Sequence, residues 1–517
     1  KFCGNCEVKT MSEKFYLTTP LYYVNGVPHV GHTYTTVIAD AIARYKKICG
    51  LEVYALTGTD EHGLKIERSA KAQAITAQEL TDIYAEAFKN AWQELGLKFD
   101  EFIRTTEDRH KRAVKKIFNR IYDNNFVYMG EYAGNYCVNC EAYVPEGEKM
   151  CSDCGRSTEY MTEQSYFFQL SAFQEKLLRF YEENPRFVIP ETRMNEVVSF
   201  VQGGLKDLSI SRTSFRWGIR VPENDEHIFY VWFDALTGYM SGVGFGTQEK
   251  KFQLYWPADL QLIGKDILRF HAVYWPAFLM AAGLELPHQI LVNGWWTVDG
   301  EKMSKSRGNT VTAQELSQLA RPDYIKYFLL REISIGADGN FSYDLLLSRV
   351  NTDLANDLGN LCSRILKMVK NYFDGCMPDC REIEGGDVDL KRFTAESVKL
   401  YRDSFDRLEI NKAIDKVWEL ISTVNKYLVV NEPWVLARDP SQRGRLGTVL
   451  YNSGECLRII AILMAPVIPD GASKILKQLG VKTSLDDHRI SHLSWGGLEQ
   501  GSSIGEIEPI YPRLDST

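Results

Sequence analysis

The order of predicted elements between residues 15 and 63 restricts the fold most strongly. A short apolar strand over residues 15–19 precedes a loop, and a helix with one apolar face runs from about Thr33 to Gly50. A second strand over residues 53–57 follows. Strand, helix and strand in this order form a parallel α/β unit, so ligand-binding residues are expected at the carboxyl ends of the strands.

The character of the chain changes twice after this unit. From Phe126 to about residue 200, short aromatic strands, glycines and clustered cysteines replace the α/β pattern, which then resumes at residue 228. After about residue 345 the chain is nearly all helical, with one helix expected to begin at an Asn411 cap. We therefore predict an α/β domain with one parallel sheet that is interrupted by an insert, followed by an all-α helical-bundle domain.

Composition excludes several classes of protein. The chain has 517 residues, 44% of them hydrophobic and 25% charged, as in soluble globular proteins of two to four domains. A net charge of −8 argues against a uniformly basic nucleic-acid-binding surface, although local basic patches remain compatible with it. No apolar run approaches the roughly 20 residues of a membrane span, and the polar first thirteen residues lack a secretory core. We expect a cytoplasmic protein without membrane association.

Two short segments have residue types suited to binding polyphosphate. His29 and His32 flank Gly31 at a predicted helix start, where free amides and the helix dipole favour an anion. Lys302 and Lys305 lie three apart in a loop after a predicted strand. Taken alone, the histidines could equally be structural and the lysines a solvated face. No Walker-type phosphate loop is present, which disfavours a P-loop nucleotidase.

Four cysteines in the insert have the spacing of a metal site. Cys137 and Cys140 form one C-x-x-C pair, and Cys151 and Cys154 form another. Four thiolates spaced in this way predict one tetrahedral, structural Zn²⁺ with no open position for catalysis; the alternative is four reduced thiols. The total of eleven cysteines, an odd number, favours thiols and metal ligands over disulfides. Cys3 and Cys6 form a further C-x-x-C without a partner pair.

The histidine and lysine segments together resemble the two ATP signatures of class I aminoacyl-tRNA synthetases. The resemblance is to the methionyl-tRNA synthetases in particular, from about Lys14 to the C-terminus. It is most specific in the lysine loop and in residues 23–26, 58–63, 231–235 and 264–267. One pair of cysteine knuckles corresponds to the one-zinc subgroup.

The resemblance implies a Rossmann-type α/β parallel-sheet catalytic domain with a zinc-binding insert, followed by an all-α helical-bundle domain. The implied domains are an N-terminal tail (1–13), the Rossmann catalytic domain in two halves (14–125 and 204–298), the connective insert with its zinc knuckle (126–203), the lysine signature loop with a stem-contact region (299–350), and a helical anticodon-binding domain (351–517). It implies a methionine–tRNA ligase that activates L-methionine with ATP to methionyl-adenylate and pyrophosphate. The enzyme would then transfer the methionyl group to the 3′-terminal adenosine of tRNA(Met), including the initiator. The chain stops soon after Arg513, and without a further C-terminal domain a monomer is expected.

The family's functional residues carry over to matching positions of this sequence. The side-chain pocket for methionine would be lined by Leu21, Tyr23, Trp232, Ala235, Leu236, Tyr239, Ile267 and His271, with Asp60 holding the α-ammonium. Aromatic faces suit a polarisable thioether, and a carboxylate suits the cation. By itself, Trp232 would be read as a core residue.

For ATP, delivered with Mg²⁺ as substrate, the resemblance implicates His29, His32, Lys265, Asp266, Lys302 and Lys305. Lys265 resembles a phosphate contact, Asp266 a ribose contact, and Arg212 a residue near the reacting carboxylate or phosphate. The predicted catalytic set is His29, His32, Lys302, Lys305, Lys265 and Arg212. The attacking carboxylate is already ionised, so positioning and charge neutralisation would provide the catalysis without a general base.

For the anticodon, the resemblance implicates Asn360, Arg364 and Trp434, through polar contacts and stacking on the indole. Without the family, Trp434 would be read as a core residue.

Several other readings compete. The isoleucyl, valyl and leucyl synthetases carry an editing domain larger than this insert, and a cysteinyl enzyme would bring zinc into the amino-acid pocket. A catalytically silent RNA-binding paralogue would have lost the phosphate ligands, yet His29, His32, Lys302 and Lys305 are present. An ATP-dependent ligase acting on a small molecule would lack the RNA-binding residues of the helical domain.

Overall fold

A six-stranded parallel sheet forms the centre of the catalytic part of the chain. The computed structural model describes residues 13–138, 142–144, 149–151, 155–298, 301–302, 310–490 and 493–515. The strand order is β3-β2-β1-β12-β13-β7, and every neighbouring pair is parallel. The strands are β1 (Lys14–Tyr23), β2 (Glu52–Asp60), β3 (Glu101–Arg104), β7 (Val188–Ile189), β12 (Leu260–Gly264) and β13 (Ile290–Asn293).

The sheet has a topological switch point between β1 and β12. These strands are neighbours, with Leu17 opposite Leu260, and the chain runs outward from β1 to β2 and β3 on one side and from β12 to β13 on the other. Ligands bind beyond the carboxyl ends of the strands at such a point. The strand ends at Tyr23, Asp60 and Gly264 lie at that edge. The switch point therefore decides where a site can form.

Helix α1 (Val30–Ile48) starts earlier than the periodicity indicates. We expected a start near Thr33, but His29 caps the helix with its own side chain, which adds the first turn. Cys49 is the C-cap, and Gly50 has a φ of +96°, a left-handed conformation that suits glycine.

Helices cover both faces of the sheet. One face packs against α1 and α3, and its core continues into the helical domain; the other packs against α4, α8 and α10 in a separate core. Beyond α1, the helices of this part are α2 (Leu64–Ala72), α3 (Ala77–Glu94), α4 (Asp108–Asp123), α5 (Gln174–Glu183), α6 (Glu191–Gln202), α7 (Val231–Leu236), α8 (Gly238–Ser241), α9 (Glu249–Tyr255) and α10 (Trp275–Ala281). Shorter helical turns are η1 (Leu170–Phe173), η2 (Lys265–Ile267) and the π-helical η3 (Phe270–Tyr274).

The predicted insert, residues 126–203, is built mainly on an antiparallel sheet of order β5-β4-β6-β8. The strands of this sheet are β4 (Val127–Cys137), β5 (Ala142–Tyr143), β6 (Glu159–Phe168) and, beyond the predicted insert, β8 (Leu208–Ser209). Strand β7, although inside the predicted insert, pairs with β13 and forms one edge of the main sheet. A second small sheet contains β9 (Ser211–Arg212), β10 (Arg220–Val221) and β11 (Asn224–Phe229).

A third small sheet follows the main sheet. It has the order β15-β14-β16, from β14 (Trp296–Val298), β15 (Glu301–Lys302) and β16 (Gly339–Phe341). Between and after its strands lie α11 (Ala313–Leu319), α12 (Pro322–Glu332) and α13 (Tyr343–Arg349).

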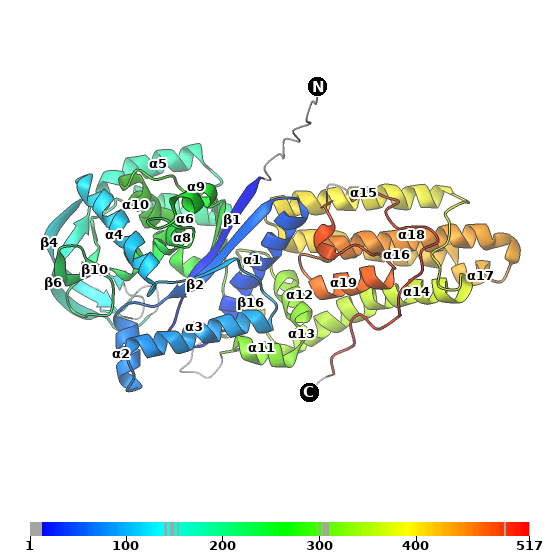
Figure 1. Ribbon diagram of the computed structural model, residues 1–517, viewed down its shortest axis with the longest axis horizontal. Coiled ribbons are helices and arrows are strands. Elements are labelled where there is room, and N and C mark those ends of the chain that lie inside the picture. The colour runs from blue at the N-terminus through cyan, green and yellow to red at the C-terminus, as the bar shows by residue number, and fades with distance from the viewer. Residues whose placement is uncertain are drawn as a thin grey trace, which may run out of the picture.

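The C-terminal part is a helical bundle that extends to the right in Figure 1, away from the sheet. It contains the π-helical η5 (Val350–Gly359) and the helices α14 (Asn360–Tyr372), α15 (Gly385–Asp406), α16 (Ile410–Asn431), α17 (Pro433–Leu436), α18 (Arg443–Met464) and α19 (Pro469–Gln478), with the short turns η6 (Pro440–Gln442) and η7 (Leu485–Asp487). Among the described residues, one helical stretch, Pro440–Met464, is long and apolar enough to cross a membrane, and its most apolar 18 residues are wholly buried inside the protein. It is the central helix of the bundle.

The predicted cap of α16 was wrong. The helix begins at Ile410 after Glu409, and Asn411 lies inside it. The Asn411 amide instead donates to Ser334 Oγ at 2.9 Å, across to the segment that follows α12. A tertiary partner has replaced the local cap.

Candidate active site

The two histidines form the first turn of α1. His29 Nδ1 accepts from the backbone N–H of Gly31 at 3.1 Å, and His32 Nδ1 accepts from the N–H of His29 at 3.3 Å. Their rings stack with centroids 3.9 Å apart. Because each Nδ1 accepts, each neutral ring carries its proton on Nε2. The pair therefore presents two N–H donors at a helix N-terminus, where an anion is favoured.

Residues 311–313, which follow the lysine loop, are hydrogen-bonded to residues 28–30, which we call the histidine loop. The Val30 N–H donates to the Val311 carbonyl at 2.8 Å, and the Ala313 N–H donates to the Pro28 carbonyl at 2.9 Å. His29 and Thr312 form an antiparallel bridge between these bonds. On the other side of the loop, Lys302 belongs to β15, opposite Thr297 of β14. Both ends of the loop are thus held by strand pairing, and one of them adjoins His29.

Lys305 and the Lys302 side chain lie outside the described part of the structure, so their contacts stay predictions.

Lys265 and Asp266 directly follow β12. The Lys265 ammonium contacts both carboxylate oxygens of Asp338, at 2.6 and 2.8 Å, and lies 4.1 Å from the centroid of the Trp295 ring. Trp295 Nε1 donates to Asp266 Oδ1 at 3.3 Å. Burial raises the pKa of Asp338, but the Lys265 ammonium and the backbone N–H of Trp295, which donates to Asp338 Oδ1 at 2.8 Å, outweigh it, so the net shift is downward. Lys265 is therefore held at the switch point by a counter-ion and an aromatic ring.

Most of the predicted methionine-pocket residues lie in or against one core, whereas Tyr23 packs against the other. Leu21, Trp232 and Ile267 pack at the edge of the first of these cores, and Trp232 stacks on Phe270 with ring centroids 3.8 Å apart. Ala235, Leu236, Tyr239 and His271 are buried. Sequence reasoning missed Phe270, which fixes the plane of the Trp232 indole; its one signal was its place in the aromatic segment before His271.

His271 is held as a neutral ring. Its Nδ1 donates to the Ile267 carbonyl at 3.0 Å, so its Nε2 must accept from the Tyr239 hydroxyl at 2.7 Å. Burial lowers the pKa of His271 from 6.5 to about 4. This side of the cluster is therefore polar but uncharged, which suits a thioether.

Asp60 ends β2 opposite Tyr23 of β1 and is buried. Its position at the carboxyl end of a central strand fits a carboxylate that meets a ligand cation.

Sequence reasoning also missed a buried carboxylate network beside this cluster. Asp234 accepts from His62 Nδ1 and from His110 Nε2, each at 2.7 Å. Next to it, Glu61 is paired with Arg104, whose Nε donates to Oε1 at 2.6 Å. The available signal was the acidic Asp234 inside an apolar run, because a buried carboxylate needs partners.

The predicted anticodon residues are exposed on the helical bundle. Asn360 and Arg364 lie on the outer face of α14, and Arg364 reaches Asn425 of α16 at 3.4 Å. Trp434, on α17, is 37% exposed, with the still more exposed Val430 nearby in sequence. Exposed apolar side chains that gather in one patch are typical of a surface that contacts another molecule.

The chain is similar to known proteins along nearly its whole length. The family model for class I tRNA synthetases (M) matches residues 15–160 and 147–366, and the model for the anticodon binding domain of methionyl tRNA ligase matches residues 377–511. The methionine–tRNA ligase of Caldanaerobacter subterraneus is 46% identical over 98% of this chain and 80% of its own length. That of Rickettsia felis is 44% identical over 98% and 99%.

The solved structure of Mycobacterium tuberculosis methionyl-tRNA synthetase in complex with methionyl-adenylate is similar throughout. The TM-score is 0.93 at 42% identity, over 97% of this chain and all of that one. This chain belongs to the methionine–tRNA ligases.

As a methionine–tRNA ligase, the chain is a class I aminoacyl-tRNA synthetase. It activates L-methionine with ATP to methionyl-adenylate and pyrophosphate, and it transfers the methionyl group to the 3′-terminal adenosine of tRNA(Met). The α/β catalytic domain and the helical domain expected from the sequence are confirmed.

In this methionine–tRNA ligase, Arg212 is 1% exposed and enclosed by protein groups. Its Nη1 donates to Ser209 Oγ at 2.8 Å and to the Ser211 carbonyl at 2.6 Å, and its guanidinium lies 4.4 Å from the centroid of the Tyr230 ring. Glu163 is its counter-ion, at 3.7 Å. The predicted role of Arg212 near a reacting group requires this side chain to change its contacts.

Two of the four predicted zinc ligands lie among the described residues. Cys137 and Cys151 are buried and belong to one small cluster with Val144. The Gly155 N–H donates to the Cys151 carbonyl at 2.8 Å. Cys140 and Cys154 lie outside the described residues, within which there is no group of three or more potential metal ligands. The two described thiols fit one half of a four-cysteine site.

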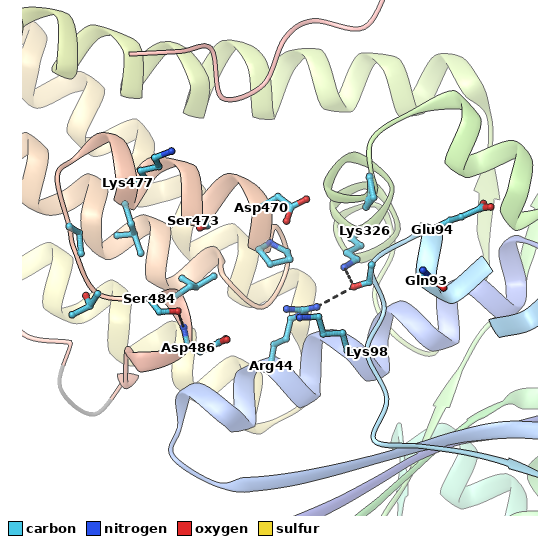
Figure 2. A pocket seen from close by; sticks show the side chains of 17 residues that line it. Arg44, Gln93, Glu94, Lys98, Lys326, Asp470, Ser473, Lys477, Ser484 and Asp486 are labelled. Carbon is cyan, nitrogen blue, oxygen red and sulfur yellow. Dashed lines mark hydrogen bonds between the residues drawn. The ribbon is translucent and has the colours of Figure 1, made fainter. Parts of the chain in front are cut away.

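A separate cavity of about 430 Å³ lies where the catalytic domain meets α12 and α19 (Figure 2). Arg44 and Lys326 both donate to the Gly96 carbonyl there, at 3.2 and 3.0 Å, and both contact Asp40. Arg44 lies twelve residues beyond His32 on α1, roughly 18 Å along the helix axis. The cavity is thus distinct from the active site, and its ion pairs connect α1 to α12.

Proposed function

We propose that methionyl-adenylate forms at the switch point of the sheet, with the histidine loop and the lysine loop holding the triphosphate between them. The observation that carries this proposal is the pairing of residues 28–30 with residues 311–313, which brings the end of the lysine loop beside His29. The Nε2–H donors of His29 and His32 support the same assignment, because they suit phosphate oxygens.

In this proposal the methionine carboxylate attacks the α-phosphate in line, and Mg²⁺ enters with ATP as part of the substrate. No general base is needed, because the nucleophile is already ionised. His29, His32, Lys265, Lys302 and Lys305 neutralise the charge that develops on pyrophosphate. Asp266 binds the ribose, and Arg212 acts near the reacting groups only after it has left its contacts with Ser209 and Ser211.

Methionine lies with its ammonium on Asp60 and its thioether among Leu21, Tyr23, Trp232, Ala235, Leu236, Tyr239, Ile267 and His271. The neutral tautomer of His271 and the stacked Trp232 support this assignment, because the cluster offers polarisable faces without a net charge.

The helical domain reads the anticodon of tRNA(Met), including the initiator. Trp434 stacks on a base, while Asn360 and Arg364 make polar contacts. The exposure of all three residues supports this assignment.

One structural Zn²⁺ is held by Cys137, Cys140, Cys151 and Cys154. The burial of Cys137 and Cys151 in one cluster supports it. The test is the zinc content of purified protein, expected at about one ion per chain. Cys154→Ser should lower this content while Cys376→Ser, an exposed cysteine outside the insert, should not. Equal zinc content in all three proteins would contradict the site.

We also propose that the enzyme is a monomer and that it is located in the cytoplasm. Light scattering on the eluting peak of a sizing column tests the monomer, and cell fractionation tests the compartment.

The experiment for the amino-acid site is ATP–pyrophosphate exchange with each of the twenty amino acids in turn. Exchange driven chiefly by methionine is expected. Exchange driven chiefly by another amino acid would overturn the assignment of Trp232 and its neighbours. Tyr122→Ala, on the far side of α4, serves as a control, because this exposed side chain contacts none of the site residues named above.

A further inference from the structure

Asp234 is a fully enclosed acidic group beside the active site. Its carboxylate is fully buried on α7, and each of its oxygens meets one histidine ring: Oδ2 meets His62 Nδ1 and Oδ1 meets His110 Nε2, both at 2.7 Å. His110 in turn contacts Ser241 Oγ at 2.9 Å through its Nδ1. One carboxylate therefore connects the loop after β2, the first turn of α4, and α7, and reaches α8 through His110.

The elements joined in this way carry the proposed methionine contacts. His62 lies two residues after Asp60, and Asp234 lies between Trp232 and Ala235. Both ends of the His62–Asp234 bond are thus within two residues of a group assigned to methionine.

Helix α8 packs closely against both the network and the proposed methionine pocket. A Cβ added at Gly238 would lie 2.2 Å from Leu21 Cδ1 and 3.9 Å from His110 Cε1. The network therefore lies next to Leu21, one of the residues assigned to the thioether.

The hydrogen bonds of this network orient its two histidine rings. An ionised carboxylate only accepts, so His62 must donate through Nδ1 and His110 through Nε2, which fixes both rings. Burial raises the pKa of Asp234, but the histidines outweigh it and the net shift is downward, so the carboxylate stays ionised at neutral pH. None of the three groups is needed for charge neutralisation at the phosphates.

We propose that Asp234 is a positioning residue for methionine recognition, which acts through His62 to hold the Asp60 end of β2 at a fixed distance from the Trp232 segment of α7. This inference rests on the proposed roles of Asp60 and Trp232. It adds a residue that touches neither substrate but sets the separation between the ammonium site and the thioether site.

The test exploits the geometry of the His62 bond. Asparagine places its amide N–H close to where histidine places Nδ1–H, so His62→Asn keeps the donor to Asp234, whereas His62→Ala removes it. In ATP–pyrophosphate exchange, Asp234→Asn and His62→Ala should each raise the KM for methionine at least ~10-fold and leave the KM for ATP within ~2-fold. His62→Asn should return the methionine KM to within ~3-fold of the parent protein.

A double variant separates positioning from general damage. If His62 and Asp234 act as one unit, the double variant His62→Ala with Asp234→Asn should be no worse than the poorer single variant. His288→Ala is the matched control, because it breaks a histidine–aspartate contact of 3.2 Å to Asp259. Asp259 directly precedes β12, so it lies at the amino ends of the strands, away from the site at their carboxyl ends. His288→Ala should leave both KM values unchanged.

Two results would overturn the inference. One is a methionine KM within ~2-fold of the parent value in folded His62→Ala protein. The other is an equal rise of both KM values that His62→Asn fails to rescue, since this would reduce the network to a structural role. Should Asp234→Asn fail to fold, the two His62 variants decide the question alone. Failure of the proposed function would look different, because the parent protein itself would then show no preference for methionine.

Discussion

The Tyr239 hydroxyl donates to His271 Nε2 at 2.7 Å, which leaves the opposite ring nitrogen to donate to the Ile267 carbonyl. This chain of two hydrogen bonds holds a neutral imidazole in a buried position. It also makes the free energy of folding depend on pH, because the unfolded ring protonates more easily than the folded one.

The sign follows from the depressed pKa. The folded pKa of His271 is about 4, below its ordinary value of 6.5, so between these values the unfolded chain binds more protons. The contribution of His271 is full above pH 6.5 and is lost as the pH falls toward 4. We expect His271→Gln to flatten the decrease in stability between pH 6.5 and 4.5, where the parent slope includes up to about 1.4 kcal/mol per pH unit from this group. Chemical denaturation at several pH values measures it, and identical slopes would contradict it.

Lys305→Ala should slow adenylate formation about 10²-fold and leave methionine binding largely intact, because the lysine is expected to meet the departing pyrophosphate. Single-turnover kinetics with saturating methionine measures the step. Lys98→Ala removes an exposed lysine beside the cavity in Figure 2 and should leave the rate unchanged. An unaltered rate in Lys305→Ala would exclude the role.

Trp434→Ala should spare ATP–pyrophosphate exchange and impair tRNA charging, because the indole is exposed at the end of the bundle. Trp418→Ala is the structural contrast. That ring is half-buried with its centroid 4.9 Å from that of Tyr327, so its loss should lower the melting temperature. Equal loss of both reaction steps in Trp434→Ala would show that Trp434 is structural.

Arg445→Met should destabilise the helical domain by about 3–5 kcal/mol, because it leaves the buried Asp387 carboxylate without its cation. The pair contacts at 2.5 Å, and Arg445 also holds Asn431, near the turn that carries Trp434. Replacing both partners, Arg445→Met with Asp387→Leu, should recover much of the loss. The thermal unfolding of the three proteins, followed by circular dichroism, measures the difference. A double variant less stable than the single one would contradict the pairing.

Local sequence patterns predicted the parallel unit and the helical C-terminal domain, because periodicity and turn residues report on neighbours along the chain. They placed the start of α1 three residues too late, since His29 caps it with a side chain that is an uncommon cap. They also assigned Asn411 a local role that the contact with Ser334 overrides. Local sequence patterns also did not predict that β7 belongs to the main sheet, because a two-residue strand has no periodicity.

The sequence by itself determined which residue types are available for phosphate, methionine and anticodon, since these occur in short segments with recognisable spacing. Only the tertiary structure decided how they are oriented. The bonds of Asp234 to His62 and His110 span 172 and 124 residues, and nothing local to either end indicates the other. The pairing of the histidine loop with residues 311–313 is likewise long-range. Hydrogen-bond geometry and burial arise only when the strands come together, and they fix the tautomers and charges on which the chemistry depends.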